Sequence, residues 1–167
     1  MTTVNAVNTY IVPTAAREVT MPSQPAFSAR PPNVPTITGT GTVYQYGTDA
    51  MTEFFDQNAD FDPATGILTS PVTGKYYFHT TSYVGTCTIN TSCKVILITS
   101  NRSYQGATWK PADNQNESAL CDVLADMDAA DTATCSVVGT GEVADTEALD
   151  AISEGVVLSC FGGNLVC

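Results

Sequence analysis

Short apolar and β-branched runs, cut by turn residues about every ten positions, predict a chain built almost entirely of β-strands. Threonine and valine are frequent in these runs, and apolar residues at helical spacing are scarce. This pattern is typical of a β-sandwich or β-barrel. The predicted strands are Thr42–Tyr46, Gly74–Tyr83, Lys94–Thr99, Ala119–Met127, Thr132–Val138 and Gly155–Phe161.

Two segments depart from simple alternation. Val95-Ile96-Leu97-Ile98 is apolar on both faces, which predicts a strand that is covered on both sides, on the second side by a neighbouring subunit. Asp145–Glu154 is the one helix-like stretch, with Leu149 and Ile152 three residues apart and acidic residues in its first turn.

The N-terminal part of the chain predicts an extended arm. Prolines at positions 13, 22, 25, 31, 32 and 35 are incompatible with a regular helix or a central strand. We therefore expect two parts, an arm at residues 1–25 and a globular domain at residues 26–167. The arm is expected to lie on another subunit or another protein. Its anchoring residues would be Tyr10, Ile11, Val12, Pro13, Met21 and Pro22.

Residues 54–78, FFDQNADFDPATGILTSPVTGKYYF, resemble the signature of the globular head domain of complement C1q, a member of the tumour-necrosis-factor-like jelly rolls. Phe27-Ser28-Ala29 resembles the opening strand of that family, and residues 161–165 resemble its final strand. The resemblance implies an all-β, antiparallel jelly-roll sandwich that forms a homotrimer about a threefold axis. The core and trimer residues expected from it are Tyr76, Phe78, Ile96, Ile98, Phe161 and Leu165. The six cysteines and the acidic stretch Gly139–Glu154 have no clear counterpart in that family.

A second resemblance concerns the arm. The stretch from Tyr10-Ile11-Val12-Pro13 to Pro25-Ala26-Phe27 is similar to the openings of structural proteins of tailed bacteriophages. The chain shows neither a secretion signal nor a collagen-like Gly-X-Y stalk, both of which a secreted C1q relative would need. This favours a protein of the virion surface that is assembled in the host cytoplasm.

The charge excludes two classes of partner. Six Lys+Arg against 17 Asp+Glu give a net charge of −11, which argues against nucleic acid and against an anionic membrane surface. Up to Lys110 the six basic residues are balanced by six acidic residues, and after Lys110 the charged residues are all acidic. The whole net charge therefore lies after Lys110. A solvated acidic surface is the simplest interpretation. A calcium site is the alternative, at Asp122, Asp126, Asp128 and Asp131, although the spacing lacks the loop of an EF-hand.

Catalytic patterns are weak throughout the chain, and we predict that the protein is not an enzyme. His79 is the sole histidine, and it lies in a predicted strand with no G-x-S-x-G motif anywhere. The C-x-x-C and H-E-x-x-H motifs of zinc sites are also missing. Asp56, Asp60 and Asp62 could flank a glycosidic bond, but they coincide with a turn motif that already explains them. No catalytic, metal or cofactor residue is therefore assigned.

The six cysteines allow fifteen disulfide connectivities. Local spacing favours three pairs, each across an expected turn: Cys87 with Cys93, Cys121 with Cys135, and Cys160 with Cys167. Cys121 and Cys135 are the strongest case, because a hairpin would place both on one apolar face. The alternative is that the cysteines are small buried residues in a reducing cytoplasm.

Taken together, these features predict a non-enzymatic phage virion protein, either a capsid decoration (cement) protein or a fibre-tip protein. Its partners would be further copies of itself, the major capsid or tail protein through the arm, and the host surface. The alternative function is a secreted C1q-like recognition module that binds proteins or glycans.

Overall fold

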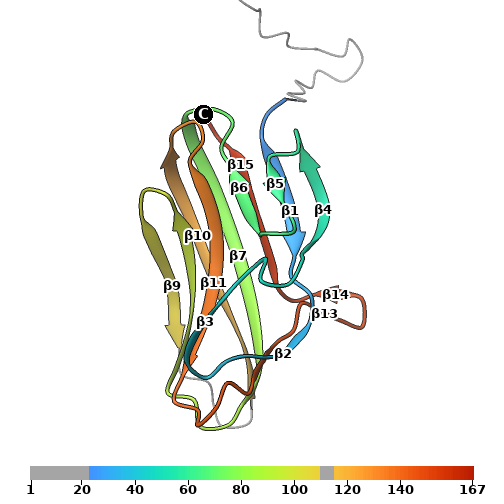
Figure 1. Cartoon of the computed structure of the whole chain (residues 1–167), viewed down its shortest axis with the longest axis vertical. Coiled ribbons are helices and arrows are strands. Elements are labelled where there is room, and N and C mark those ends of the chain that lie inside the picture. Colours follow the sequence, from blue (N-terminus) through green and yellow to red (C-terminus); the bar gives the residue numbers. More distant parts are fainter. Residues whose placement is uncertain (1–22, 110–114) are drawn as a thin grey trace, which may run out of the picture.

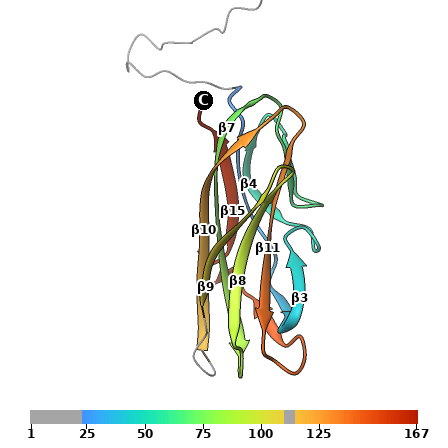
Figure 2. The same cartoon turned by 90° about the vertical axis from the view of Figure 1, so that its left-hand side faces the viewer.

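The structure is a computed structural model that describes residues 23–109 and 115–167, and in these ranges the chain forms strands and no helix. Two antiparallel sheets pack face to face as a sandwich (Figures 1 and 2). The anchoring residues expected between Tyr10 and Pro22 lie outside the described residues. The all-β antiparallel sandwich predicted from the sequence is confirmed.

The first sheet is organised around β7, its longest strand. Strand β7 pairs with β10 along one edge, and with β15 and then β12 along the other edge. Strands β1 and β4 continue the sheet beyond β15, and β2 continues it beyond β12. The strands of this sheet are β1 (Ala26–Arg30), β2 (Val34–Thr38), β4 (Thr52–Gln57), β7 (Gly74–Cys87), β10 (Gln115–Met127), β12 (Glu147–Leu149) and β15 (Cys160–Leu165).

The second sheet has the order β5-β6-β11-β8-β9. Its strands are β5 (Phe61–Asp62), β6 (Ile67–Thr69), β8 (Ser92–Thr99), β9 (Ser103–Trp109) and β11 (Thr132–Thr140). Strand β3 (Thr40–Gln45) lies beside β11, where the Tyr46 amide donates to the Cys135 carbonyl at 2.9 Å. Strands β13 (Ile152–Ser153) and β14 (Val156–Val157) form a separate small hairpin.

Four phenylalanine rings fill the space between the sheets at one end of the core. The ring centroid of Phe27 lies 4.5 Å from that of Phe61 and 4.9 Å from that of Phe161. Phe78 lies next to Phe161, with their centroids 6.2 Å apart. All four side chains are buried. Alternate residues of β1, β7 and β15 supply three of these rings, because side chains in a strand point to opposite faces in turn.

The two ends of the described chain, at residues 23 and 167, lie at the same end of the sandwich (Figure 1). The Leu165 amide donates to the Pro25 carbonyl at 2.9 Å, and the Lys75 amide donates to the Cys167 carbonyl at 2.7 Å. The β7–β8 turn lies at the opposite end of the sandwich (Figure 1).

Two predicted elements are wrong. The stretch 145–154 forms no helix; it holds β12 and β13, and the backbone of Leu149 pairs with Val84 of β7 and Val34 of β2. The pairing partners offered by two longer strands outweigh a weak helical spacing. The strand predicted at 155–161 is divided into β14 and the start of β15. In β8, Val95 and Leu97 are buried, whereas Ile96 and Ile98 on the other face are half-buried in the single chain.

The prediction of a hairpin that brings Cys121 opposite Cys135 is also wrong. Cys121 lies on β10 of the first sheet, opposite Thr80, while Cys135 lies on β11 of the second sheet, opposite Leu97. The turn after β10 therefore carries the chain from one sheet to the other. Both thiols face the core, and all six cysteines are free.

Cys160 and Cys167 do not bracket a turn, because Gly162, Gly163 and Asn164 are part of β15. At about 3.3 Å per residue the two cysteines are separated by roughly 20 Å, far beyond the Cα separation of about 7 Å that a disulfide tolerates. Their predicted pairing is therefore wrong. Cys87 and Cys93 do flank the β7–β8 turn as buried thiols, and a crosslink between them stays a prediction.

Candidate functional site

One face of the first sheet has no further layer over it in the part of the chain that the structure describes. This outer face is the side of β10, β7, β15, β1 and β4 that points away from the second sheet, and Figure 2 shows β10, β7 and β15 edge-on at that side. Strand pairing places Leu124 beside Tyr77 and Leu120 beside Thr81. Leu120, Leu124 and Tyr77 are all exposed, so an apolar surface faces solvent in the single chain.

Small residues make the middle of the outer face flat. Gly162 on β15 lies between His79 of β7 and Ser28 of β1, and Ser28 lies beside the exposed Phe55 of β4. A Cβ atom added to Gly162 would lie 2.6 Å from Cε1 of His79, so the imidazole ring rests directly over the glycine. A flat surface that carries exposed leucine and aromatic side chains between the charged Lys75, Asp122 and Asp126 suits packing against another protein surface.

His79 and Cys160 form a polar pair within the outer face. A hydrogen bond to Cys160 raises the pKa of His79; burial opposes this change, and the charges of Cys160 and Asp122 add to it. The same hydrogen bond lowers the pKa of the Cys160 thiol, and Thr81 Oγ1, 3.3 Å from the sulfur, lowers it further. Burial instead raises the pKa of the thiols of Cys87, Cys93, Cys121 and Cys135. The pKa of Cys160 is therefore shifted in the opposite direction from the pKa values of the four buried cysteines.

We expect Cys160 to titrate below the ordinary thiol range and His79→Gln to move its titration upward, because glutamine cannot supply an imidazolium charge. The difference in thiolate ultraviolet absorbance between the wild type and Cys160→Ser, followed against pH, measures this titration. Cys121→Ser serves as the control and should remove a signal only at higher pH. An unchanged midpoint in His79→Gln would contradict the pairing.

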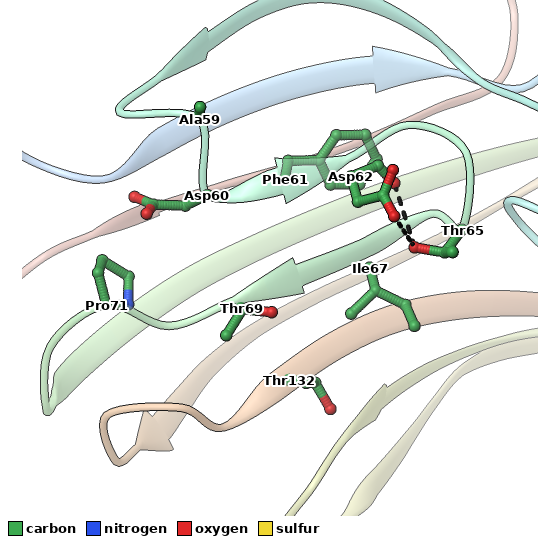
Figure 3. Close-up of a pocket in the computed structure, with 9 residues that line it drawn as sticks. All are labelled: Ala59, Asp60, Phe61, Asp62, Thr65, Ile67, Thr69, Pro71 and Thr132. Atoms are coloured by element: carbon green, nitrogen blue, oxygen red, sulfur yellow. Dashed lines mark hydrogen bonds between the residues drawn. The ribbon is translucent and has the colours of Figure 1, made fainter.

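A shallow hollow of about 540 Å³ lies beside the β5–β6 hairpin and contains two of the three carboxylates considered for glycoside hydrolysis (Figure 3). Asp62 accepts from the Ala64 amide at 2.9 Å and from Thr65 Oγ1 at 2.8 Å, which closes the turn. Asp56 accepts from the Phe61 amide at 3.0 Å. Asp60 is left with a buried oxygen that has no partner. Burial and the neighbouring Asp56 raise the pKa of Asp60. Turn structure accounts for Asp56 and Asp62, as expected.

The acidic residues that were considered for calcium are spread over a strand and a turn. Asp126 pairs with Lys75 at 2.7 Å, and Asp131 accepts from the Asp128 amide at 2.8 Å and from Asn101 at 2.7 Å. Among residues 23–109 and 115–167, no group of three or more His, Cys, Asp or Glu side chains is arranged to hold a metal ion. The same residues contain no helix long and apolar enough to span a membrane.

The residues expected in the core and trimer contact fall into two groups. Tyr76, Phe78 and Phe161 are buried between the sheets, while Ile96, Ile98 and Leu165 are half-buried. Sequence reasoning missed Leu120 and Leu124. The available signal was the spacing of two residues that relates Leu120, Asp122, Leu124 and Asp126. This spacing places two leucines and two acids on one face of β10.

No protein-family model matches the chain, and no curated protein matches it in sequence. Its fold is similar to that of many solved structures, among them the following three. The globular domain of zebrafish complement 1qA protein matches at a TM-score of 0.57 with 16% identity, over 86% of this chain and 98% of that chain. Murine APRIL matches at 0.58 with 12% identity, over 86% and 99%. The PRD1 vertex protein P5 matches at 0.61 with 9% identity, over 95% and 82%.

These identities are low, so the similarity shows the fold alone. The chain has the antiparallel jelly-roll sandwich of the C1q and tumour-necrosis-factor type, as the resemblance of residues 54–78 predicted.

Proposed function

We propose that this chain is the subunit of a non-enzymatic, homotrimeric protein of a phage virion surface, serving as a capsid decoration or fibre-tip protein. The jelly roll forms the trimer through the outer face, and the arm at residues 1–25 attaches the trimer to a capsid or tail protein. The observation that carries this proposal is the set of large apolar side chains on the outer face, with Leu120, Leu124 and Tyr77 exposed on adjacent strands.

Self-association accounts for this face better than solvent exposure does. A neighbouring copy would bury the exposed leucines and the flat strip around Gly162, and closed symmetry would use the same patches in every subunit. The half-buried side chains of Ile96 and Ile98 on the second sheet add apolar surface for contacts between subunits or with the particle.

The virion context is supported by two features of different kinds. The fold is similar to that of a phage PRD1 vertex protein, by name a component of a virus particle. The arm carries the prolines and the Tyr10-Ile11-Val12-Pro13 stretch that resemble openings of tailed-phage structural proteins. The net charge of −11 would help to keep neighbouring trimers soluble before assembly.

A secreted recognition module that binds proteins or glycans is the second candidate. It is favoured by the similarity in fold to zebrafish complement 1qA protein and to murine APRIL. The two candidates differ in what the arm does, because attachment to a particle requires it and recognition through the domain does not.

Deletion of residues 1–23 tests the proposal. We expect light scattering at micromolar concentration to give a three-chain mass for both the full chain and the truncated chain. Only the full chain should cosediment with particles from the same source that lack this protein, because the proposal assigns attachment to the residues that are deleted. Equal cosedimentation of both forms would contradict the anchoring role. A one-chain mass for the full protein would contradict the trimer.

A further inference from the structure

The β7–β8 turn lies at one end of the sandwich (Figure 1). Two glutamates from the segment that follows β11 hold this turn by hydrogen bonds. Glu142 accepts from the Thr88 amide at 2.6 Å, from Thr88 Oγ1 at 2.7 Å and from the Ile89 amide at 2.8 Å. Burial opposes ionisation of Glu142, yet hydrogen bonds from Thr88 and Ile89 outweigh it and lower its pKa. Glu142 therefore holds the turn as a carboxylate.

Glu147 holds the same turn in a different way. Its side chain is 0% exposed, and Oε1 accepts a hydrogen bond from Nδ2 of Asn90, which is itself 2% exposed. The second oxygen of each group, Oε2 of Glu147 and Oδ1 of Asn90, is buried without a partner. A Cβ atom at Gly139 would lie 1.8 Å from Oε2, so the backbone packs closely against the carboxyl group.

One hydrogen atom shared between Oε2 of Glu147 and Oδ1 of Asn90 would give both unpartnered oxygens a hydrogen bond. An ionised carboxylate and an amide oxygen are both acceptors, so neither can satisfy the other. A proton on Oε2 turns that oxygen into a donor for Oδ1, while Nδ2 continues to donate to Oε1. One proton would thus complete a pair of parallel hydrogen bonds between a carboxylic acid and an amide, and it would remove the cost of two buried unsatisfied oxygens.

We propose that Glu147 carries a proton in the folded chain and forms a doubly hydrogen-bonded acid–amide pair with Asn90. This pair makes the attachment of the β7–β8 turn to the sandwich sensitive to pH. The pair joins several elements. Asn90 belongs to the β7–β8 turn, and the backbone of Glu147 pairs with Thr38 of β2. Loss of the proton therefore weakens the attachment of the turn and of β12 together.

The surroundings of Glu147 favour the protonated form. The titratable groups that face it are Glu142 and Asp145 from its own segment, Cys87 from β7 and Cys93 from β8. Burial raises the pKa of Glu147 to about 7 against the hydrogen bond from Asn90, which lowers it, and the charges of Glu142 and Asp145 raise it further. None of these neighbours carries a positive charge.

The sign of the pH effect follows from the raised pKa. Below the ordinary value of 4.5, Glu147 is protonated in both the folded and the unfolded chain, and its contribution to stability is fully present. Between 4.5 and about 7 the folded chain keeps a proton that the unfolded chain has lost, so stability falls as pH rises. Above about 7 the contribution is gone.

Urea unfolding of the full chain and of Glu147→Gln, from pH 5 to pH 9, tests this proposal. Glutamine keeps the shape, stays neutral, and can donate from its amide to Oδ1 of Asn90. We expect the folding equilibrium constant of the wild type, divided by that of the variant, to fall about 80-fold over this range, from a pKa of about 7 in the folded chain and 4.5 in the unfolded chain. Glu154→Gln, on the exposed β13–β14 turn, is the control and should follow the wild type.

A parallel fall in the wild type and in Glu147→Gln would overturn the proposal. A direct measurement covers the case in which the variant does not fold. Carboxyl-carbon NMR of the wild-type chain labelled in glutamate should show one carboxyl that titrates near pH 7. If every glutamate carboxyl is already ionised at pH 6, Glu147 holds no proton and the acid–amide pair does not exist.

Discussion

Replacing Leu124 with aspartate is expected to convert the proposed trimer into a folded monomer. Leu124 is 59% exposed in the single chain, so the substitution removes little packing within the subunit. At a subunit contact, however, each copy would bury a further carboxylate between Asp122 and Asp126 with no positive partner of its own, at a cost of several kcal/mol per charge. A cost of about 4 kcal/mol weakens association about a thousandfold. Sedimentation equilibrium gives the mass, and circular dichroism reports whether the strands persist.

Val43→Asp is a matched control for this experiment. Val43 lies on β3, away from the outer face, and has the same exposed fraction as Leu124, 59%. We expect the Val43→Asp protein to keep its three-chain mass. A trimer that survives Leu124→Asp would show that the outer face is not the contact between subunits. Equal dissociation of both variants would show that added charge, and not its position, is responsible.

Replacing Phe161 with alanine is expected to lower the free energy of unfolding by about 3–5 kcal/mol, a large part of the roughly 5–15 kcal/mol that stabilises a typical domain. Phe161 is fully buried, and its ring centroid lies 4.9 Å from Phe27 and 6.2 Å from both Phe61 and Phe78. The truncation would leave a cavity that these rings fill only in part, because strands from both sheets hold them. Urea unfolding at fixed protein concentration measures the change.

Leu165→Ala on the same strand is the comparison for Phe161→Ala. Leu165 is half-buried at the end of β15, so its truncation should lower the free energy of unfolding by a smaller amount. Equal losses for the two variants would show that the cluster of phenylalanine rings does not concentrate the stability of the core.

The strands of this fold were predictable where aromatic, apolar and β-branched residues predominate over a long stretch. Residues 74–83 and 119–127 are such stretches, and they form the greater part of β7 and β10, the longest pair of strands among the described residues. The turn at Asp62 and Gly66 was also predictable, because aspartate and glycine are favoured in tight turns. In the structure Asp62 accepts a hydrogen bond from the Ala64 amide, and Gly66 has a φ of 67°. Periodicity determines the type of such elements but not which strands become neighbours.

That missing information explains the errors in the cysteine pairs and in the candidate site. Cys121 and Cys135 are separated by one turn in sequence, yet whether that turn joins two strands of one sheet or crosses between sheets depends on long-range pairing with β7 and β8. The pairing of Glu147 with Asn90 likewise joins residues 57 positions apart. The outer face was hidden for the same reason, since exposure of Leu124 is decided by which side of the sheet the second layer covers.

Pro25 and Cys167 lie at the same end of the sandwich, which gives the domain a polarity that matters for engineering. A peptide fused after Cys167 would emerge near Pro25, where the domain joins the proposed arm. In the proposed particle that position faces inward, so such a tag would be concealed and would compete with attachment. The opposite end, around the β7–β8 turn, would point outward (Figure 1). A display scaffold built on this chain would therefore carry its cargo at that end.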